Sequence, residues 1–430
     1  MENSGEDPAQ IPTEANSLVQ HKLLKTVWEM LERVEPPLSF KCCIYRVPRR
    51  LHKENEEAYT PQVISIGPLH YGEKMLQTME KHKLRYLGKF LDRAKVSLAS
   101  FIQAIGHREE SIRCSYAESI PLCSDEFIKM VLMDSSFIIE LFLRKYFPSL
   151  QDEHDHVLFK PWLQDDIEKD LILLENQLPL FVLKDLFELA FASSLNDWPP
   201  FLELTYHFFK SYNYQDRPPQ VNAQHFTDMI RNFFLPWSRM SPTSASDKLV
   251  YIPSATELDS TGVKFKVSSS KCALELEFNN EVLEIPRFEI YDRTESFLRN
   301  LMAFEQCQYP YNTYVCDYIF LMDCLINTNK DVDLLVQKKI IINGLGDNAA
   351  VATLVNNLCK NITLCEGCFF FTNVAQELNS YYEILWHSWN ATFVRDYFGN
   401  PWVSASTIAA VVLLVLTFIQ AICSVISVYP

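Results

Sequence analysis

The sequence predicts a mainly α-helical protein: a large helical body with a small antiparallel β insert and one C-terminal transmembrane helix. Three observations predict this class. Apolar residues recur at helical spacing over most of the chain. The period changes from 3.6 to 2 between about 262 and 286. Finally, the 26 residues from Val403 to Val428 contain no charged side chain.

Composition sets limits on the function. The chain has 430 residues, of which 48% are hydrophobic and 13% aromatic, so it can bury a large core. Its net charge is −15. Because phosphate contacts dominate nucleic-acid binding, an acidic chain of this kind is not expected to bind nucleic acid. The ten glycines are too few to favour a glycine-rich nucleotide loop.

The elements of the body follow from periodicity and capping signals. Residues 1–16 are polar and acidic and predict a disordered leader, and Ser17 with Gln20 forms a capping-box pattern that opens the first helix. The soluble, mainly helical body is predicted over 17–398. Its further helices are expected at 73–98, 125–146, 161–174, 180–192, from about 295, 311–327, 331–343, 347–360 and 373–397.

The β insert is expected at about 262–286. Apolar and charged residues alternate at 263–267 and again at 274–278, which is typical of strands with one buried face. If these two strands pair, Lys264 and Lys266 can face Glu275 and Glu277 across the sheet. Asn279 and Asn280 then turn the chain into a third strand, 282–285.

The C-terminal run predicts a membrane anchor. As a helix, Val403 to Val428 would extend about 39 Å, longer than the about 30 Å of a bilayer core. No secretory signal precedes the body, so the sequence predicts a single-pass membrane protein whose bulk faces the cytosol, with the plasma membrane favoured over the endoplasmic reticulum. The anchor would make the membrane one partner of this protein.

A search for catalytic and cofactor motifs predicts none. Gly67 to Lys74 imitates a phosphate loop, but Glu73 occupies the position of the essential lysine and would repel phosphate. Cys365 and Cys368 form one C-x-x-C pair without a second pair at zinc-site spacing. Asp134 and Glu140 lie on different faces of one helix, which favours capping or ion-pair roles over a shared site. We therefore expect no catalytic residues, no cofactor and no metal.

One polar cluster and one basic segment remain as candidate sites. Glu175, Asn176 and Gln177 interrupt an apolar run, where they either cap neighbouring backbone or form a ligand site. The basic segment holds five cations without an intervening acid: Lys41, Arg46, Arg49, Arg50 and Lys53. It is a solvated face, a surface that binds an anionic lipid headgroup or acidic partner, or a source of arginines for internal ion pairs.

Several long motifs resemble a plant family catalogued as domain of unknown function 247. They occur in order from Ile44 to the C-terminus: IYRVPRRL, YTPQVISIGPLHYG, MEKHKLRYL, DEFIKMVLMDSSFIIEL, ENQLPLFVL, TELDSTGVKFK, LEIPRFEI, LRNLMAFEQC and the terminal GNPW with its apolar run. This chain has Ser135 and Ser136 where the family usually has Gly and Cys. The resemblance implies a mainly helical region with one C-terminal span and no established enzymatic activity. Some grass members act as pollen-side determinants of self-incompatibility, which implies recognition and signalling for part of the family.

Together these observations predict a membrane-anchored plant recognition, signalling or scaffold protein without catalytic activity, with a self-incompatibility determinant as one such role. Protein partners are expected. The alternative is an enzyme of unrecognised type acting at a membrane surface. A pocket in which polar groups converge would favour the enzyme, and exposed aromatic or basic patches would favour recognition.

Overall fold

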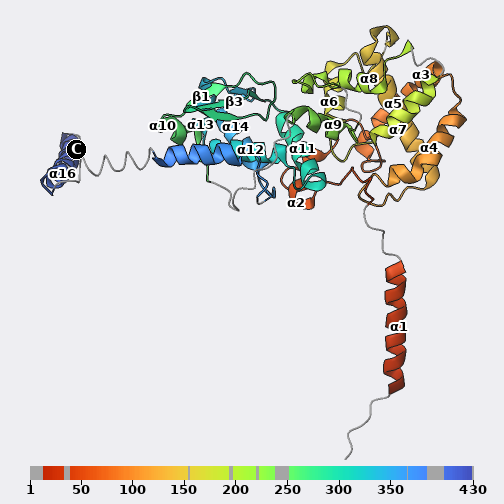
Figure 1. Ribbon diagram of the computed structural model, residues 1–430, viewed down its shortest axis with the longest axis horizontal. Helices are drawn as coiled ribbons and strands as arrows, with labels where there is room; N and C mark the ends of the chain where they lie inside the picture. The colour runs from red at the N-terminus through yellow and green to blue at the C-terminus, as the bar shows by residue number, and fades with distance from the viewer. Residues whose placement is uncertain are drawn as a thin grey trace, which may run out of the picture.

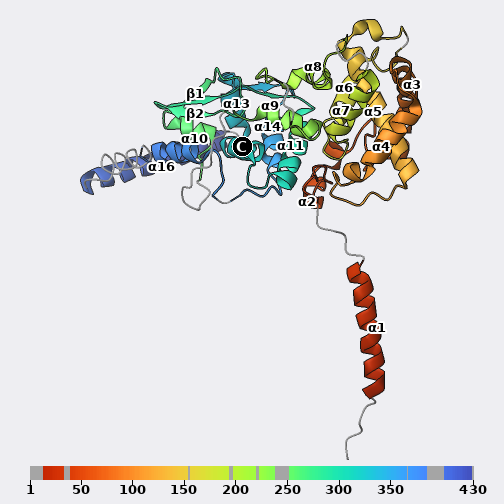
Figure 2. The same ribbon diagram turned by 45° about the vertical axis from the view of Figure 1, so that its right-hand side comes forward.

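The computed structural model describes residues 13–32, 39–153, 155–192, 197–218, 222–237, 251–365, 367–384 and 401–428. Most of the predicted leader, residues 1–12, and the second half of the predicted helix 373–397 lie outside these ranges. The body has two lobes that lie side by side in both ribbon views (Figures 1 and 2). One continuous hydrophobic core runs through both lobes.

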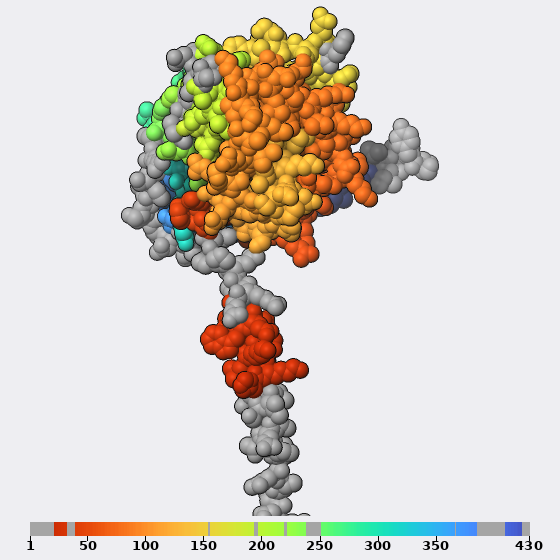
Figure 3. Space-filling view, turned by 90° about the vertical axis from the view of Figure 1, so that its right-hand side faces the viewer, coloured from red at the N-terminus to blue at the C-terminus, as the bar shows by residue number. Residues whose placement is uncertain are grey.

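The N-terminal lobe is a helical bundle around one buried helix. Helix α5 packs against the helices α3, α4, α7 and α8 and against the short helix η3. Because its apolar residues occur on all sides, it suits the centre of a bundle, and residues from Phe127 to Arg144 are almost all buried. Figure 3 shows the outer face of this lobe, with α3 and α4 in orange. The helices are α3 (Gln77–Arg93), α4 (Leu98–Arg113), α5 (Ser124–Tyr146), α6 (Pro161–Asp170), α7 (Leu180–Phe191) and α8 (Phe201–Phe208).

The second lobe is organised around α11, which contacts α9, α12 and α14. It also contacts the short 3₁₀ helix η1 of the N-terminal segment. Its helices are α9 (Phe226–Phe234), α10 (Ala255–Ser260), α11 (Thr294–Gln308), α12 (Tyr314–Leu325), α13 (Asn329–Gln337), α14 (Asn348–Leu358) and a helical segment at 372–384. Short helices are α2 (Arg49–His52), η1 (Glu56–Tyr59), η2 (Lys74–Leu76), η3 (Pro148–Leu150) and η5 (Lys210–Tyr212).

The β insert differs from the predicted antiparallel arrangement. Strand β3 (Val282–Ile285) is central, with β1 (Lys264–Val267) parallel on one side and β2 (Glu277–Asn279) antiparallel on the other. Lys266 therefore pairs with Glu284 at 2.7 Å and not with Glu275 or Glu277. A second, parallel pair joins β4 (Phe288–Ile290) to β5 (Ile341–Asn343), where a helix was predicted. Parallel pairing needs a long connection, so local alternation could not reveal it.

The turn between β2 and β3 lies one residue further along the chain than the predicted Asn279–Asn280 turn. Asn280 and Glu281 both have positive φ angles, 49° and 66°. Two consecutive left-handed residues form the type I′ turn, whose twist matches that of the flanking antiparallel strands. Asparagine tolerates this conformation, which explains why the Asn279–Asn280 signal located the hairpin.

The predicted transmembrane helix is wrong. A helix, α16 (Pro401–Val428), covers Val403 to Val428, but in the described part of the chain none of the helices combines the length and the apolar character that crossing a bilayer requires. The fold class is therefore mainly helical with two small sheets.

An irregular segment, residues 62–67, enters the N-terminal lobe and is buried from residue 64 onward. Because it is neither helix nor strand, its backbone polar groups need other partners. Asp170, at the end of α6, supplies three of them: its carboxylate accepts the backbone N–H groups of residues 62, 63 and 64, each at 2.8 Å. Burial raises the pKa of Asp170 to about 6, against these hydrogen bonds.

Three further buried side chains complete the partners of this segment. Asn176 accepts the N–H of residue 66 at 2.6 Å and donates to the carbonyl of residue 64 at 2.9 Å. Asp134 accepts the N–H of Gly67 at 2.8 Å, and Lys83 donates to the carbonyl of residue 65 at 2.5 Å. Lys83 also pairs with Asp134 at 2.6 Å. We call residues 62–67 with Asp134, Asp170, Asn176 and Lys83 the backbone-binding hub.

A buried carboxyl group fixes the C-terminal lobe in a similar way. Asp317 on α12 accepts hydrogen bonds from the hydroxyl of Thr313 and the N–H of Phe370, both at 3.0 Å. The Phe370 ring stacks on Tyr314 with a centroid distance of 3.6 Å. Burial raises the pKa of Asp317 to about 7.

Gly67 should be the least replaceable glycine of the N-terminal lobe. Its φ is +75°, and a Cβ there would lie 2.3 Å from the carbonyl oxygen of Gln177. We expect Gly67→Ala to lower the free energy of unfolding by roughly 3 kcal/mol or more, since strain and a backbone clash add. Gly72 has φ +85° with open space around it, so Gly72→Ala should cost only about 1 kcal/mol. Urea unfolding of both variants measures the difference, and equal losses would contradict the described packing.

Asp317 should make stability depend on pH. Its pKa is higher in the folded protein than in the unfolded chain, so the folded state holds the proton more tightly. The stability that Asp317 contributes is therefore present below about pH 4 and is lost as the pH rises to about 7. As the pH rises between these values, the free energy of unfolding of Asp317→Asn should increase by roughly 2–4 kcal/mol relative to that of the wild type. Parallel pH profiles for the two proteins in urea unfolding would show that Asp317 is not perturbed.

Candidate functional site

The predicted polar cluster Glu175, Asn176 and Gln177 lies between α6 and α7 and is buried. Asn176 belongs to the backbone-binding hub. Gln177 donates to the carbonyls of Leu171 and Leu173 at 2.6 and 2.8 Å and accepts the N–H of Phe226, at the start of α9, at 3.0 Å. Asn176 and Gln177 form hydrogen bonds with backbone groups, and this favours capping over a ligand site.

Glu175 connects the cluster to the basic segment. One of its oxygens accepts the N–H of Val47 at 2.7 Å, and the other pairs with Arg46 at 3.0 Å. Arg46 pairs in addition with Glu118 at 3.0 Å. His70 lies 3.6 Å from the same Glu175 oxygen and contacts Glu73 through its other ring nitrogen at 2.7 Å. Arg46 is therefore an internal ion-pair partner.

The other four cations of the basic segment do not gather into one site. Lys41 donates to Ser111 at 3.2 Å, and Arg50 donates to Gln306 at 3.3 Å. Arg49 and Lys53 are exposed and have no ion pair with another described residue. Binding of this segment to an anionic surface stays a prediction. Fewer cations are available for it than the sequence indicated, because Arg46 is already paired with Glu118 and Glu175.

A polar cavity of about 420 Å³ lies beside the backbone-binding hub, at the start of α3. Its wall includes Ser65, whose buried hydroxyl has no hydrogen-bond partner among the described residues, and Asp134. Burial raises the pKa of Asp134 to about 6. Perturbed acids in cavities are frequent at functional sites. Here, however, both carboxylate oxygens are occupied, one by Gly67 and one by Lys83, so Asp134 holds the backbone.

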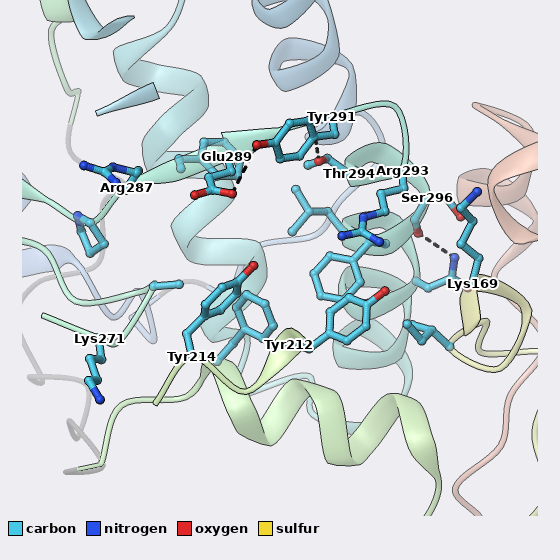
Figure 4. A pocket seen from close by; sticks show the side chains of 18 of the residues that line it. Lys169, Tyr212, Tyr214, Lys271, Arg287, Glu289, Tyr291, Arg293, Thr294 and Ser296 are labelled. Carbon is cyan, nitrogen blue, oxygen red and sulfur yellow. Dashed lines mark hydrogen bonds between the residues drawn. The ribbon is translucent and has the colours of Figure 1, made fainter. Parts of the chain in front are cut away.

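A second candidate site is a cavity of about 540 Å³ between the two lobes, which we call the interlobe cavity (Figure 4). The N-terminal lobe contributes the end of α6 and the loop around η5. The other lobe contributes the end of α9, the segment after β1, strand β4 and the first turns of α11. Cavities of this size at the junction of two lobes are the usual place for a small ligand.

Six aromatic side chains line the interlobe cavity: Tyr212, Tyr214, Phe234, Phe288, Tyr291 and Phe297. Tyr212 and Phe297 stack on each other with a centroid distance of 5.2 Å and form one wall. Tyr214 and Tyr291 are exposed to 59% and 41%. Such walls suit a flat apolar group, because aromatic rings bury much area and stack.

A glycine positions one of these rings. A Cβ at Gly344, after β5, would lie 2.1 Å from the Tyr291 ring, so only glycine leaves this ring room at the cavity wall. The Tyr291 hydroxyl donates to Glu289 at 3.5 Å. The position of Tyr291 therefore depends on the β4–β5 pair, which joins segments far apart in the sequence.

The charged residues of the wall are mostly cations. Four line the cavity, Lys169, Lys271, Arg287 and Arg293, against one acid, Glu289. Lys169 pairs with Asp166 and Lys271 with Asp216, at 3.0 and 2.8 Å. Arg287 and Arg293 form no ion pair or hydrogen bond with another described residue. In Figure 4 the Arg293 guanidinium reaches toward Tyr212, whose ring centroid lies 6.0 Å away.

Sequence reasoning did not find the interlobe cavity. Tyr212 and Tyr214 lie in a proline-bounded stretch without a periodic signal, and the other wall residues come from strands and loops downstream. The available signal was the surplus of aromatic residues, which indicates a large core equally well.

The structure also describes the candidate metal and cysteine positions. None of the described cysteines forms a disulfide. Among the described residues no group of His, Cys, Asp and Glu side chains could hold a metal ion. Burial raises the pKa of the thiols of Cys43 and Cys307 to about 12, so neither is an activated nucleophile.

Comparison with known proteins gives a family match over most of the chain. The model of a family described as plant protein of unknown function, DUF247, matches residues 44–416. The UPF0481 protein At3g47200 of Arabidopsis thaliana is 32% identical over 420 residues, 90% of this chain and 87% of that protein. The putative UPF0481 protein At3g02645 of the same plant is 22% identical over 477 residues, 88% of this chain and 89% of that protein. No solved structure matches the chain.

Because Arg46 forms ion pairs, it should contribute to the stability of the fold, whereas Arg49 should not. Arg46→Glu would place a third carboxylate beside Glu118 and the buried Glu175. Because Arg46 is partly exposed, we expect a loss of roughly 2–4 kcal/mol in the free energy of unfolding. The matched reversal Arg49→Glu should change it by less than about 0.5 kcal/mol. Urea unfolding of both variants checks this, and equal effects would refute the assigned pairs.

Proposed function

We propose, from the premise that this chain belongs to the DUF247 family of plant proteins of unknown function, that it is a recognition protein that binds a small ligand in the interlobe cavity. The part of the ligand that enters the cavity carries a flat apolar group. Catalysis has no part in this proposal.

The aromatic wall of the interlobe cavity supports the proposal. Six aromatic residues around about 540 Å³ offer a ring-shaped ligand several surfaces on which to stack. Two of them, Tyr214 and Tyr291, keep large exposed fractions although they border a cavity. A ligand that covers these rings would remove apolar surface from water, which favours binding by roughly 25 cal/mol per Å².

The position of the cavity suggests how ligand binding could be transmitted to a partner protein. Because its walls come from both lobes, a ligand that contacts Tyr212 on one side and Tyr291 on the other favours one relative placement of the lobes. A partner protein that contacts both lobes would sense this placement. Signalling and self-incompatibility stay predictions for this chain, and protein partners are part of the proposal.

The alternative, an enzyme, has less support. It would need unoccupied acid, base or nucleophilic groups that converge on a cavity. The polar cavity contains Asp134, but Lys83 and Gly67 occupy its carboxylate. In the interlobe cavity the acid is Glu289, a partner of Tyr291.

The proposal is tested by titrating the full chain with 1-naphthalenemethanol, a neutral aromatic probe, and following naphthalene fluorescence. We expect saturable binding that is weakened at least about tenfold in the double variant Tyr214→Ala, Tyr291→Ala, because two stacking surfaces are lost. The control is Tyr311→Ala, a 75% exposed tyrosine outside the cavity wall, which should bind as wild type does. Absence of saturable binding, or equal binding in the double variant, would refute the proposed function.

A further inference from the structure

Two exposed arginines of the interlobe cavity wall form no ion pair with a described residue. Arg287 lies between β3 and β4, and Arg293 immediately precedes α11. Two of the most deeply buried arginines have carboxylate partners: Arg144 pairs with Glu140 at 2.7 Å, and Arg231 pairs with Glu305 at 2.8 Å. Arg287 and Arg293 have no such partner among the described residues. Their guanidinium groups are available to a ligand.

Nearby acids do not satisfy these arginines. Glu289 is the one acid among the wall residues, and it accepts a hydrogen bond from Tyr291. Glu168 lies behind Tyr212 and acts on Arg293 electrostatically without forming an ion pair.

The chemistry of the two arginines and of the rings defines one ligand class. A guanidinium is planar and donates two parallel hydrogen bonds to a carboxylate, a geometry that an ammonium lacks. Arg293 stands beside the stacked pair Tyr212 and Phe297, so a carboxylate at Arg293 would place an attached ring against that wall. The first turn of α11 starts at Thr294 on the same wall, and a helix N-terminus favours negative charge.

We propose that the interlobe cavity selects aromatic carboxylates: the ring stacks on the tyrosine and phenylalanine wall and Arg293 binds the carboxylate, while Arg287, across the cavity in Figure 4, adds positive charge. This inference rests on the proposed function, because it names the ligand class of the same cavity. It also explains why a chain of net charge −15 keeps four cations and one acid around this cavity.

The experiment compares three naphthalenes of nearly equal shape on the full chain at low salt: 1-naphthoate, neutral 1-naphthalenemethanol and protonated 1-naphthylmethylamine. We expect the carboxylate to bind at least about tenfold more tightly than the alcohol, and the ammonium to bind more weakly than the alcohol. Raising the salt concentration should weaken the binding of the carboxylate and leave the binding of the alcohol nearly unchanged.

The variant Arg287→Gln, Arg293→Gln should reduce the preference for the carboxylate over the alcohol to less than about threefold while leaving alcohol binding within about twofold of wild type. Arg49→Gln, an exposed arginine outside the cavity, is the matched control and should keep the full preference. Thermal melts of the three proteins establish that each variant is folded.

The outcomes separate this inference from the proposed function. If the alcohol binds at the aromatic wall but the carboxylate binds no more tightly, the proposed function stands and the inference is overturned. The same holds if the ammonium binds most tightly, or if the carboxylate preference survives in the arginine variant. If none of the three probes binds, the proposed function fails and the inference fails with it.

Discussion

The fold depends on hydrogen bonds from buried side chains to an irregular stretch of backbone. Residues 62–67 cross the N-terminal lobe without a helix or a strand to satisfy their N–H and C=O groups, and an unsatisfied buried group costs roughly 1–3 kcal/mol. Asp170 accepts three consecutive N–H groups, and Asn176 and Asp134 accept two more. The polar residues that interrupt the apolar helices of this lobe are therefore needed for the path of the chain.

The same network sets the position of the interlobe cavity. Asp170 ends α6, and the turn that follows it contributes Ile172 and Leu173 to the cavity wall. Asn300 of α11 accepts the N–H of Leu174 at 3.0 Å and donates to the carbonyl of Ala58 at 2.8 Å, which ties the second lobe to this turn. The two walls of the cavity are thus connected through buried polar contacts. A ligand at the aromatic side chains would bind next to the contacts that hold the lobes together.

How far the sequence predicts this structure depends on how local each signal is. Helix α5 was predicted to within a residue at its start because its apolar pattern is contained in one stretch, and the β2–β3 turn was located because its residues are adjacent. The burial of Asn176 could be inferred, but its partner at residue 66 lies 110 residues away and could not. The parallel pairing of β1 and the strand β5 depend equally on distant segments. The interlobe cavity has the least local signal of all, since both lobes build it.

Hydrogen–deuterium exchange of the full chain with and without 1-naphthoate tests this account most directly. We predict that the backbone amides of residues 62–67 are strongly protected in both states, because buried side chains hold them in the free protein. Added protection on ligand binding should be confined to the segments that line the interlobe cavity, around 212–214 and 286–298. Fast exchange at 62–67 would contradict the backbone-binding hub, and ligand protection that appears elsewhere or nowhere would contradict the assignment of the cavity.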